Sequence, residues 1–228
     1  MAEGSISTNW AGEELMLFPE RGVYWHRTRT LLIADPHFGK TAAFRKVGIP
    51  IPSGTTTDDL GRLDSMLDSC TPDRLLILGD FFHSKAGRCE MTLQFLADWR
   101  TRRSSMEILL IRGNHDRHAG DPPPEWNIRV EAKPHAEAPF YFCHEPCDHE
   151  TLHIIGGHIH PGINLWDRTG GSIRLPCFWF GERSALVPAF GSFTGTYTVK
   201  PRRGDQLFVI GDGEVVRVRT GPMAKVPH

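Results

Sequence analysis

The chain has 228 residues, of which 39% are hydrophobic and 23% are charged, and its formal net charge is -1 at pH 7. This length suits one α/β domain with a substantial core, and we expect a single domain over residues 1–228 with a flexible start over residues 1–14. The balanced charge excludes a basic field over the whole protein, so a polyanion would have to be bound locally.

No signal for a membrane or for secretion is found in the sequence. Residues 1–14 contain neither the basic nor the apolar segment of a signal peptide, and no later stretch is apolar for long enough to cross a bilayer. The odd number of cysteines, five, favours reduced thiols, although Cys143 and Cys147 flank His144 and leave a zinc site as an alternative. We therefore expect a cytoplasmic protein with no membrane partner.

The first half of the chain alternates predicted strands and helices. A hairpin of residues 15–18 and 23–26 leads into the first apolar strand. Alternating strands and helices of this kind predict a parallel sheet with right-handed crossover connections. Its elements are a strand over 30–34, a helix over 53–70 capped by Thr56 or Thr57, a strand over 75–78, a helix over 91–100 and a strand over 107–111.

The second half of the chain is rich in short strands. A Gly/Pro-rich segment over 120–124 marks the boundary, and residues 38–52 are expected to form a long loop over the edge of the first sheet. Strands are predicted over 128–131, 140–143, 152–155, 172–180, 185–188, 206–210 and 215–218. Two packed sheets flanked by helices account for both halves.

Three strands of the parallel unit end in side chains that suit divalent metals. The first strand is followed by Asp35 and His37, the second by Asp80 and the third by Asn114. Ligand sites of α/β sheets lie at the carboxyl ends of their strands, and oxygen with imidazole is a ligand set for divalent ions. Asp80 stands in the middle of this set, so we expect its carboxylate to bridge two metal ions.

Three histidines in the second half fall where further ligands would lie. His144, His158 and His160 each follow an apolar run. In Asp35-x-His37 and in His158-x-His160 the alternate residues share one face of the chain. Each fragment is common by chance when taken alone, whereas the ordered set of seven side chains is specific.

The ordered blocks resemble those of the calcineurin-like metallophosphoesterases. They are Asp35-Pro36-His37, Gly79-Asp80, Gly113-Asn114-His115-Asp116, His144, and Gly157-His158-Ile159-His160. The resemblance implies a four-layer α/β/β/α sandwich of two mixed β-sheets flanked by helices. It also implies two metal sites that share Asp80. One is formed by Asp35, His37, Asp80 and His160, and the other by Asp80, Asn114, His144 and His158.

A narrower resemblance is to the PdeM phosphoesterases of ligase-associated bacterial DNA-repair clusters. It is carried by residues 35–40, 44–52, 79–84, 175–179 and 187–195, with Pro36 departing from the leucine that is usual there. PdeM members are described as manganese-dependent DNA endonucleases. The resemblance therefore implies two divalent ions, manganese first, with iron or zinc also suited to the ligands. It implies a DNA substrate and a DNA-repair ligase, helicase and exonuclease as partners.

The expected mechanism is in-line attack on phosphorus by a hydroxide shared between two metal ions, which lower the pKa of its parent water. His115 would protonate the leaving oxygen or stabilise charge in the transition state, and Asp116 would orient the imidazole of His115. His83 would contact the phosphate or donate a proton, and a supporting or simple loop role is the alternative for it. Phosphate contacts are expected from Lys40, Arg45 and Arg112, for which a solvated charge or an ion pair is the alternative.

The leading functional hypothesis is a DNA endonuclease in bacterial repair. A phosphodiesterase or pyrophosphatase acting on a small or lipid-linked nucleotide, such as UDP-diacylglucosamine, is the first alternative. A non-catalytic scaffold is the second, and the presence of all seven ligands and His115 argues against it. The aromatic residues Trp179 and Phe193 could stack on unpaired bases, although most aromatics in such strands belong to the core.

Overall fold

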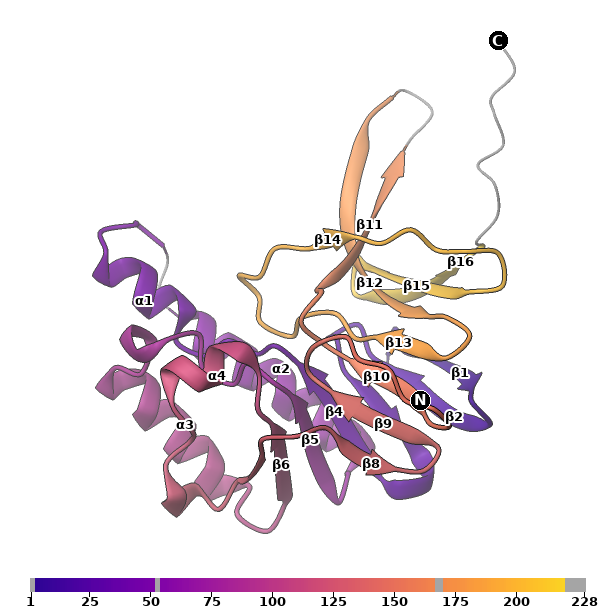
Figure 1. Cartoon of the computed structure of the whole chain (residues 1–228). Helices are drawn as coiled ribbons and strands as arrows, with labels where there is room; N and C mark the ends of the chain where they lie inside the picture. Colours follow the sequence, from indigo (N-terminus) through magenta and orange to yellow (C-terminus); the bar gives the residue numbers. More distant parts are fainter. Residues whose placement is uncertain (1–2, 52–53, 167–169, 220–228) are drawn as a thin grey trace.

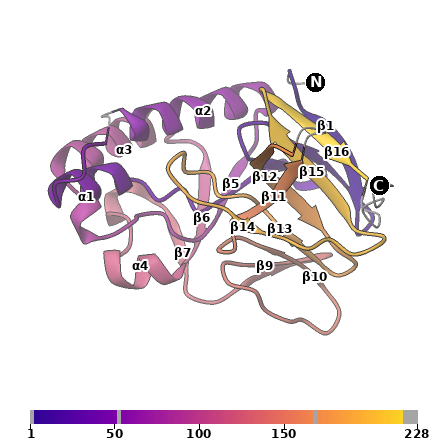
Figure 2. The ribbon, with the colours of Figure 1, turned by 90° about the horizontal axis from the view of Figure 1, so that it is seen from above.

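Two β-sheets packed face to face organise the chain, and the helices lie along one of them (Figure 1). The computed structural model describes residues 3–51, 54–166 and 170–219. Seen from above, α1, α2, α3 and α4 gather on the side of the first sheet, with the strands of the second sheet beyond it (Figure 2). The expected pair of mixed sheets with flanking helices is confirmed.

The first sheet has seven strands in the order β1-β2-β3-β4-β5-β6-β7. The pairs from β1 to β4 are antiparallel and those from β4 to β7 are parallel, which confirms the predicted hairpin and parallel unit. The strands are β1 (Ile6–Trp10), β2 (Glu13–Leu17), β3 (Val23–Trp25), β4 (Thr30–Ala34), β5 (Arg74–Leu78), β6 (Glu107–Ile111) and β7 (Arg129–Glu131).

The second sheet has nine strands, seven in the order β14-β11-β12-β13-β10-β9-β8, with β15 paired to β12 and β16 paired to β15. They are β8 (His135–Glu137), β9 (Phe140–Cys143), β10 (His153–Gly156), β11 (Pro161–Trp166), β12 (Ser172–Phe180), β13 (Ser184–Leu186), β14 (Tyr197–Thr198), β15 (Gln206–Gly211) and β16 (Glu214–Val218).

The described helices fall within the first 126 residues of the chain. They are α1 (Lys40–Lys46), α2 (Thr55–Cys70), α3 (Glu90–Arg102) and α4 (Asn114–Ala119), with 3-10 turns η1 (His26–Thr28), η2 (Lys85–Gly87) and η3 (Pro124–Trp126). Within the described ranges, no helix is both long enough and apolar enough to span a bilayer.

Strands β4, β5 and β6 are buried on both faces, and this explains why they are continuously apolar in sequence. Leu32, Leu76 and Leu109 face the second sheet and pack there with aromatic residues such as Phe142 and Phe178. The alternate residues of the same strands face α2 and α3 in a separate cluster. Each fully buried side chain of this kind stabilises the fold by about 2 kcal/mol.

The outer face of the second sheet carries a third, smaller cluster. Cys177, Leu207 and Val209 pack there with Val199, which lies just after β14. In the part of the chain that the structure describes, this face is therefore covered by the segment around β14 and not by an α-helix.

Several local predictions were wrong. The start of the chain forms β1 and β2 before residue 15, because the alternating burial of the two strands seats Trp10 and Leu15 in the core. Residues 40–46 form α1 instead of a loop. The residue before α2 is Gly54, and no side chain caps this helix, so Thr56 and Thr57 are not its cap. Ser53, the expected first residue of that helix, lies outside the described residues.

Candidate metal centre

The strand ends that form the site turn sharply. Asp35, His37, Asp80, His158 and His160 all have positive φ angles, between 47° and 62°. Such a conformation costs about 1 kcal/mol or more for a residue with a side chain, and it persists only where surrounding contacts fix it. Here the His37 N–H donates to the Asp80 carbonyl at 2.9 Å and the His158 N–H donates to Asp35 Oδ2 at 2.9 Å.

The first cluster consists of Asp35, His37 and His160, whose ligand atoms lie within 4.8 Å of one another. Asp35 Oδ1 lies 3.5 Å from His160 Nε2. Asp35 Oδ1, His160 Nε2 and His37 Nδ1 are buried and have no hydrogen-bond partner among the described residues. Buried polar atoms are normally paired, so Asp35 Oδ1 and His160 Nε2 fit a cation that they would coordinate.

The second cluster consists of Asp80, His144 and His158, with Asn114 beside it. His144 Nδ1 donates to the Leu78 carbonyl at 2.9 Å, so the lone pair of the neutral ring lies on Nε2. This Nε2 faces Asn114 Oδ1 at 2.8 Å and Asp80 Oδ1 at 3.5 Å. Three acceptor atoms therefore converge, an arrangement that a divalent cation satisfies.

Asp80 connects the two clusters. Its Oδ2 lies 3.7 Å from His37 Nε2 and its Oδ1 lies 3.5 Å from His144 Nε2. Burial raises the pKa of the Asp80 carboxyl, the nearby Asp35 carboxylate raises it further, and His144 lowers it. Two buried carboxylates side by side are costly without positive charge, so the donor set fits a pair of divalent ions.

Three glycines leave the space that these side chains occupy. A Cβ on Gly79 would lie 2.1 Å from His144 Nδ1, and one on Gly113 would lie 2.2 Å from Asp80 Oδ1. A Cβ on Gly157 would lie 2.7 Å from Asp35 Oδ2. The glycines of the sequence blocks are thus explained by close approach of the backbone to the candidate ligands.

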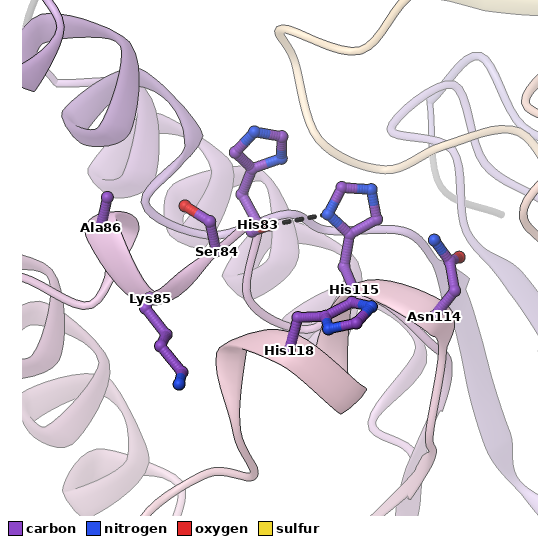
Figure 3. A pocket seen from close by; sticks show the side chains of 7 residues that line it. All are labelled: His83, Ser84, Lys85, Ala86, Asn114, His115 and His118. Carbon is purple, nitrogen blue, oxygen red and sulfur yellow. Dashed lines mark hydrogen bonds between the residues drawn. The ribbon is translucent and has the colours of Figure 1, made fainter.

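His115 is held by its neighbours at the edge of this centre. Its backbone N–H donates to Asp80 Oδ1 at 2.9 Å, and its Nδ1 donates to the His83 carbonyl at 2.6 Å. Because a carbonyl can only accept, the proton of the neutral ring lies on Nδ1. Nε2 lies 4.0 Å from Asp80 Oδ2, and the ring lines a cavity of about 560 Å³ (Figure 3).

The predicted role of Asp116 was wrong. Its buried carboxylate accepts hydrogen bonds from the backbone N–H groups of Asp80 at 2.8 Å and Gly113 at 2.9 Å. The His83 carbonyl, and not Asp116, contacts the His115 imidazole. Asp116 therefore fixes the turns that carry Asp80 and Asn114, because the first turn of α4 directs its side chain back towards the strands.

His83 lies between the metal centre and the cavity. Its ring is 5.4 Å from that of His37 and 5.1 Å from that of His115, measured between centroids. Burial lowers the pKa of His83 to about 4, with smaller contributions from the positive charges of Lys40 and His115. His83 is thus neutral near pH 7 and is not a general acid there.

The three predicted phosphate contacts occupy different environments. Lys40 is half-buried, and burial lowers its pKa, while the carboxylates of Asp35 and Asp80 raise it, which locates the amine near the metal centre. Arg45 is exposed on α1. Arg112 donates from Nε and Nη2 to the two oxygens of Asp121 at 2.9 and 2.6 Å. For Arg112 the ion-pair alternative is correct.

The sequence interpretation missed three residues that line the cavity beside His115. These are Ser84, Lys85 and His118 (Figure 3). The sequence did contain a signal for His118, because it follows His115 by three residues and so lies on the same side of a helix. Ser84 and Lys85 follow His83 directly in η2 and its cap.

The comparisons with known proteins agree with this geometry. A family model described as calcineurin-like phosphoesterase matches residues 28–160. The chain therefore belongs to the calcineurin-like phosphoesterase family, and it is a metal-dependent phosphoesterase. No curated protein matches the chain.

Among solved structures, the chain is similar to the nuclease MPE of Pseudomonas putida, with 38% identity, a TM-score of 0.83, and coverage of 94% of this chain and 100% of that one. The phosphoesterase Yfce of E. coli is more distant, with 12% identity, a TM-score of 0.39, and coverage of 83% and 97% of the two chains. The second likeness supports no further conclusion.

The Gly79→Ala variant tests the fit of the second cluster. Its new Cβ would displace His144, so we expect the variant to bind about one manganese ion per chain fewer than the wild type, measured by inductively coupled plasma mass spectrometry after dialysis. Gly48→Ala is the matched control, because Gly48 has nearly the same φ, 84° against 82°, and open space around it. Equal metal content in both variants would contradict the assignment.

Proposed function

We propose that the protein is a dinuclear metal-dependent phosphodiesterase that cleaves DNA, within bacterial DNA repair. The observation that carries this proposal is the position of Asp80, whose two oxygens approach His37 and His144 in different clusters. The 38% identity with a nuclease over 94% of the chain supports a nucleic-acid substrate. A ligase, a helicase and an exonuclease of the same repair system, in the cytoplasm, remain the proposed partners.

Seven side chains of the two clusters would hold two divalent ions, with manganese as the proposed metal. The first set is Asp35, His37, Asp80 and His160, and the second is Asp80, Asn114, His144 and His158. When bound, the ions supply Lewis acidity towards the phosphoryl oxygens and a nucleophile at neutral pH. Because the carboxylates are buried, water screens their attraction to the ions less than it would at the surface.

His115 would carry the proton for the leaving oxygen. Because Nδ1 keeps its proton in the hydrogen bond to the His83 carbonyl, a second proton would bind to Nε2. This nitrogen lies on the side of Asp80 Oδ2. A ring protonated at Nε2 is a general acid, and it also adds positive charge next to the developing negative charge. His83 holds the ring by its carbonyl and contributes a neutral imidazole beside the phosphate.

The cavity beside His115 carries side chains that can contact phosphates. His83, Ser84, Lys85 and His118 are polar, and Ala86 is the one apolar side chain among the described residues that line it. Lys85 and the half-buried Lys40 supply positive charge for phosphates.

The proposal is tested by manganese-dependent hydrolysis of bis-p-nitrophenyl phosphate together with nicking of circular single-stranded DNA. We expect both activities in the wild type and a loss of at least about a thousandfold in Asp80→Ala, because the shared ligand is removed. Asp98→Ala, on the exposed face of α3, is the control and should retain both activities. Hydrolysis of the small diester without any DNA cleavage would contradict the nuclease assignment.

His115→Ala should retain metal and lose rate in a manner that depends on the leaving group. General acids contribute roughly 10²–10⁴-fold, and the contribution is largest when the departing oxygen is basic. We therefore expect a larger fall in kcat for a dinucleotide than for bis-p-nitrophenyl phosphate. An equal fall for both substrates, with unchanged metal content, would show that His115 is not the acid.

His83→Gln should lower kcat/KM without moving the acidic limb of its pH profile. The pKa of about 4 keeps His83 neutral above about pH 5, so its protonation makes no contribution to the limb in that range. The measurement is kcat/KM for bis-p-nitrophenyl phosphate between about pH 5 and 9. A shift of the limb by a full pH unit would mean that His83 titrates within the working range.

A further inference from the structure

A basic groove lies on the second sheet, outside the metal centre. It has a volume of about 1000 Å³ and is bordered by the ends of β12 and β13 and by residues 197–205. Its cationic side chains are Arg183, Lys200, Arg202 and Arg203. Because the chain as a whole has a net charge of -1, this local concentration of positive charge is a specific feature of the fold.

The acidic residues of the groove do not cancel this charge. The groove has two acidic side chains, Glu182 and Asp205, and four cationic ones. The Asp205 carboxylate is used to build the groove, since it accepts from Trp179 Nε1 at 2.8 Å and from the Arg202 backbone N–H at 2.6 Å. Arg183 is fixed by backbone carbonyls, among them that of Glu150 at 2.9 Å, whereas Lys200, Arg202 and Arg203 are exposed.

An exposed aromatic ring stands beside these cations. Tyr197 lines the groove and is 68% exposed, so its ring is accessible. Surfaces that bind single-stranded nucleic acid combine a positive groove, which follows the phosphates, with aromatic rings on which unpaired bases stack. The groove has both components.

The groove and the metal centre share one loop. Ile159 lines the groove and lies between His158 and His160 in sequence. The Tyr197 backbone N–H donates to the His160 carbonyl at 2.8 Å. A single nucleic-acid strand bound at Tyr197 would therefore lie against the loop that carries two candidate metal ligands.

The cavity beside His115 and the groove belong to different halves of the fold. The cavity is bordered by η2 and α4, which flank the first sheet, and the groove by β13 and β14 of the second sheet (Figure 1). The candidate ligands come from both halves, after β4, β5 and β6 of the first sheet and after β9 and β10 of the second.

We propose that the groove at Tyr197, Lys200, Arg202 and Arg203 binds the unpaired strand of the substrate beyond the scissile phosphodiester. This inference rests on the proposed nuclease function and adds a second binding site to it. Lys200, Arg202 and Arg203 neutralise backbone phosphates, and Tyr197 stacks on a base. None of the candidate metal ligands lines the groove, so we expect it to contribute to the binding of polymers and not of a small diester.

The test measures binding of a fluorescein-labelled oligothymidylate of about 20 nucleotides by fluorescence anisotropy in EDTA, so that binding is observed without cleavage. We expect the double variant Arg202→Ala/Arg203→Ala to weaken binding about tenfold. The slope of the logarithm of the association constant against the logarithm of the salt concentration should become smaller in magnitude by about 0.7 for each phosphate that is no longer neutralised. Tyr197→Ala should weaken binding about tenfold and Tyr197→Phe should restore it, because stacking needs only the ring.

Arg102→Ala/Arg129→Ala is the matched control, since it removes the same charge from exposed sites on α3 and β7. In the presence of manganese, the groove variants should raise the KM for the oligonucleotide about tenfold and leave that for bis-p-nitrophenyl phosphate within twofold. Wild-type binding and salt slope in the groove variants would overturn the inference. So would competition by polyglutamate equal to that of the oligonucleotide, which would indicate an acidic protein as the occupant.

These outcomes separate the inference from the proposed function. Loss of strand binding in the groove variants supports the inference even in a protein that does not cut DNA. Cleavage of DNA with unchanged binding in the groove variants supports the function and overturns the inference.

Discussion

One buried carboxylate determines most of the local structure. Asp80 lies between the two clusters, 1% exposed, and its left-handed backbone turn is fixed by the Asp116 carboxylate on one side and by the His37 N–H on the other. An isolated charge in such a place is costly, so the turn, the space at Gly113 and the His115 N–H all serve to hold Asp80 in one orientation. The pair of divalent ions that we propose adds positive charge to that of the nearby Lys40 amine.

The packing of the two sheets brings the site together. The ends of β4, β5 and β6 carry Asp35, His37, Asp80 and Asn114, whereas the residues after β9 and β10 carry His144, His158 and His160. The core between the sheets, with Phe142 and Phe178 fully buried, therefore sets the distance between the two halves of the donor set. A protein interior deforms little, so the separation of the ligands is fixed by the fold and not by the ions.

The elements with a strong hydrophobic signal were predictable from the sequence. The parallel strands were recognised because burial on both faces makes them continuously apolar, and the donor set because metal chemistry limits the residue types. Asp116 was misinterpreted because neighbours in sequence do not show where a side chain points. For Arg112 the sequence left the ion pair as an alternative without identifying its partner, which is Asp121, nine positions along the chain. The groove could not be found, because Arg183 and residues 200–203 meet only after β12 and β15 pair.

The central claim is that Asp80 is shared between two ions. Its most direct test is electron paramagnetic resonance of the metal-free protein titrated with manganese(II). We predict two ions per chain and, at saturation, the spectrum of an exchange-coupled pair, because one carboxylate bridges both. A single ion per chain, or two ions with the spectrum of isolated manganese, would contradict this account.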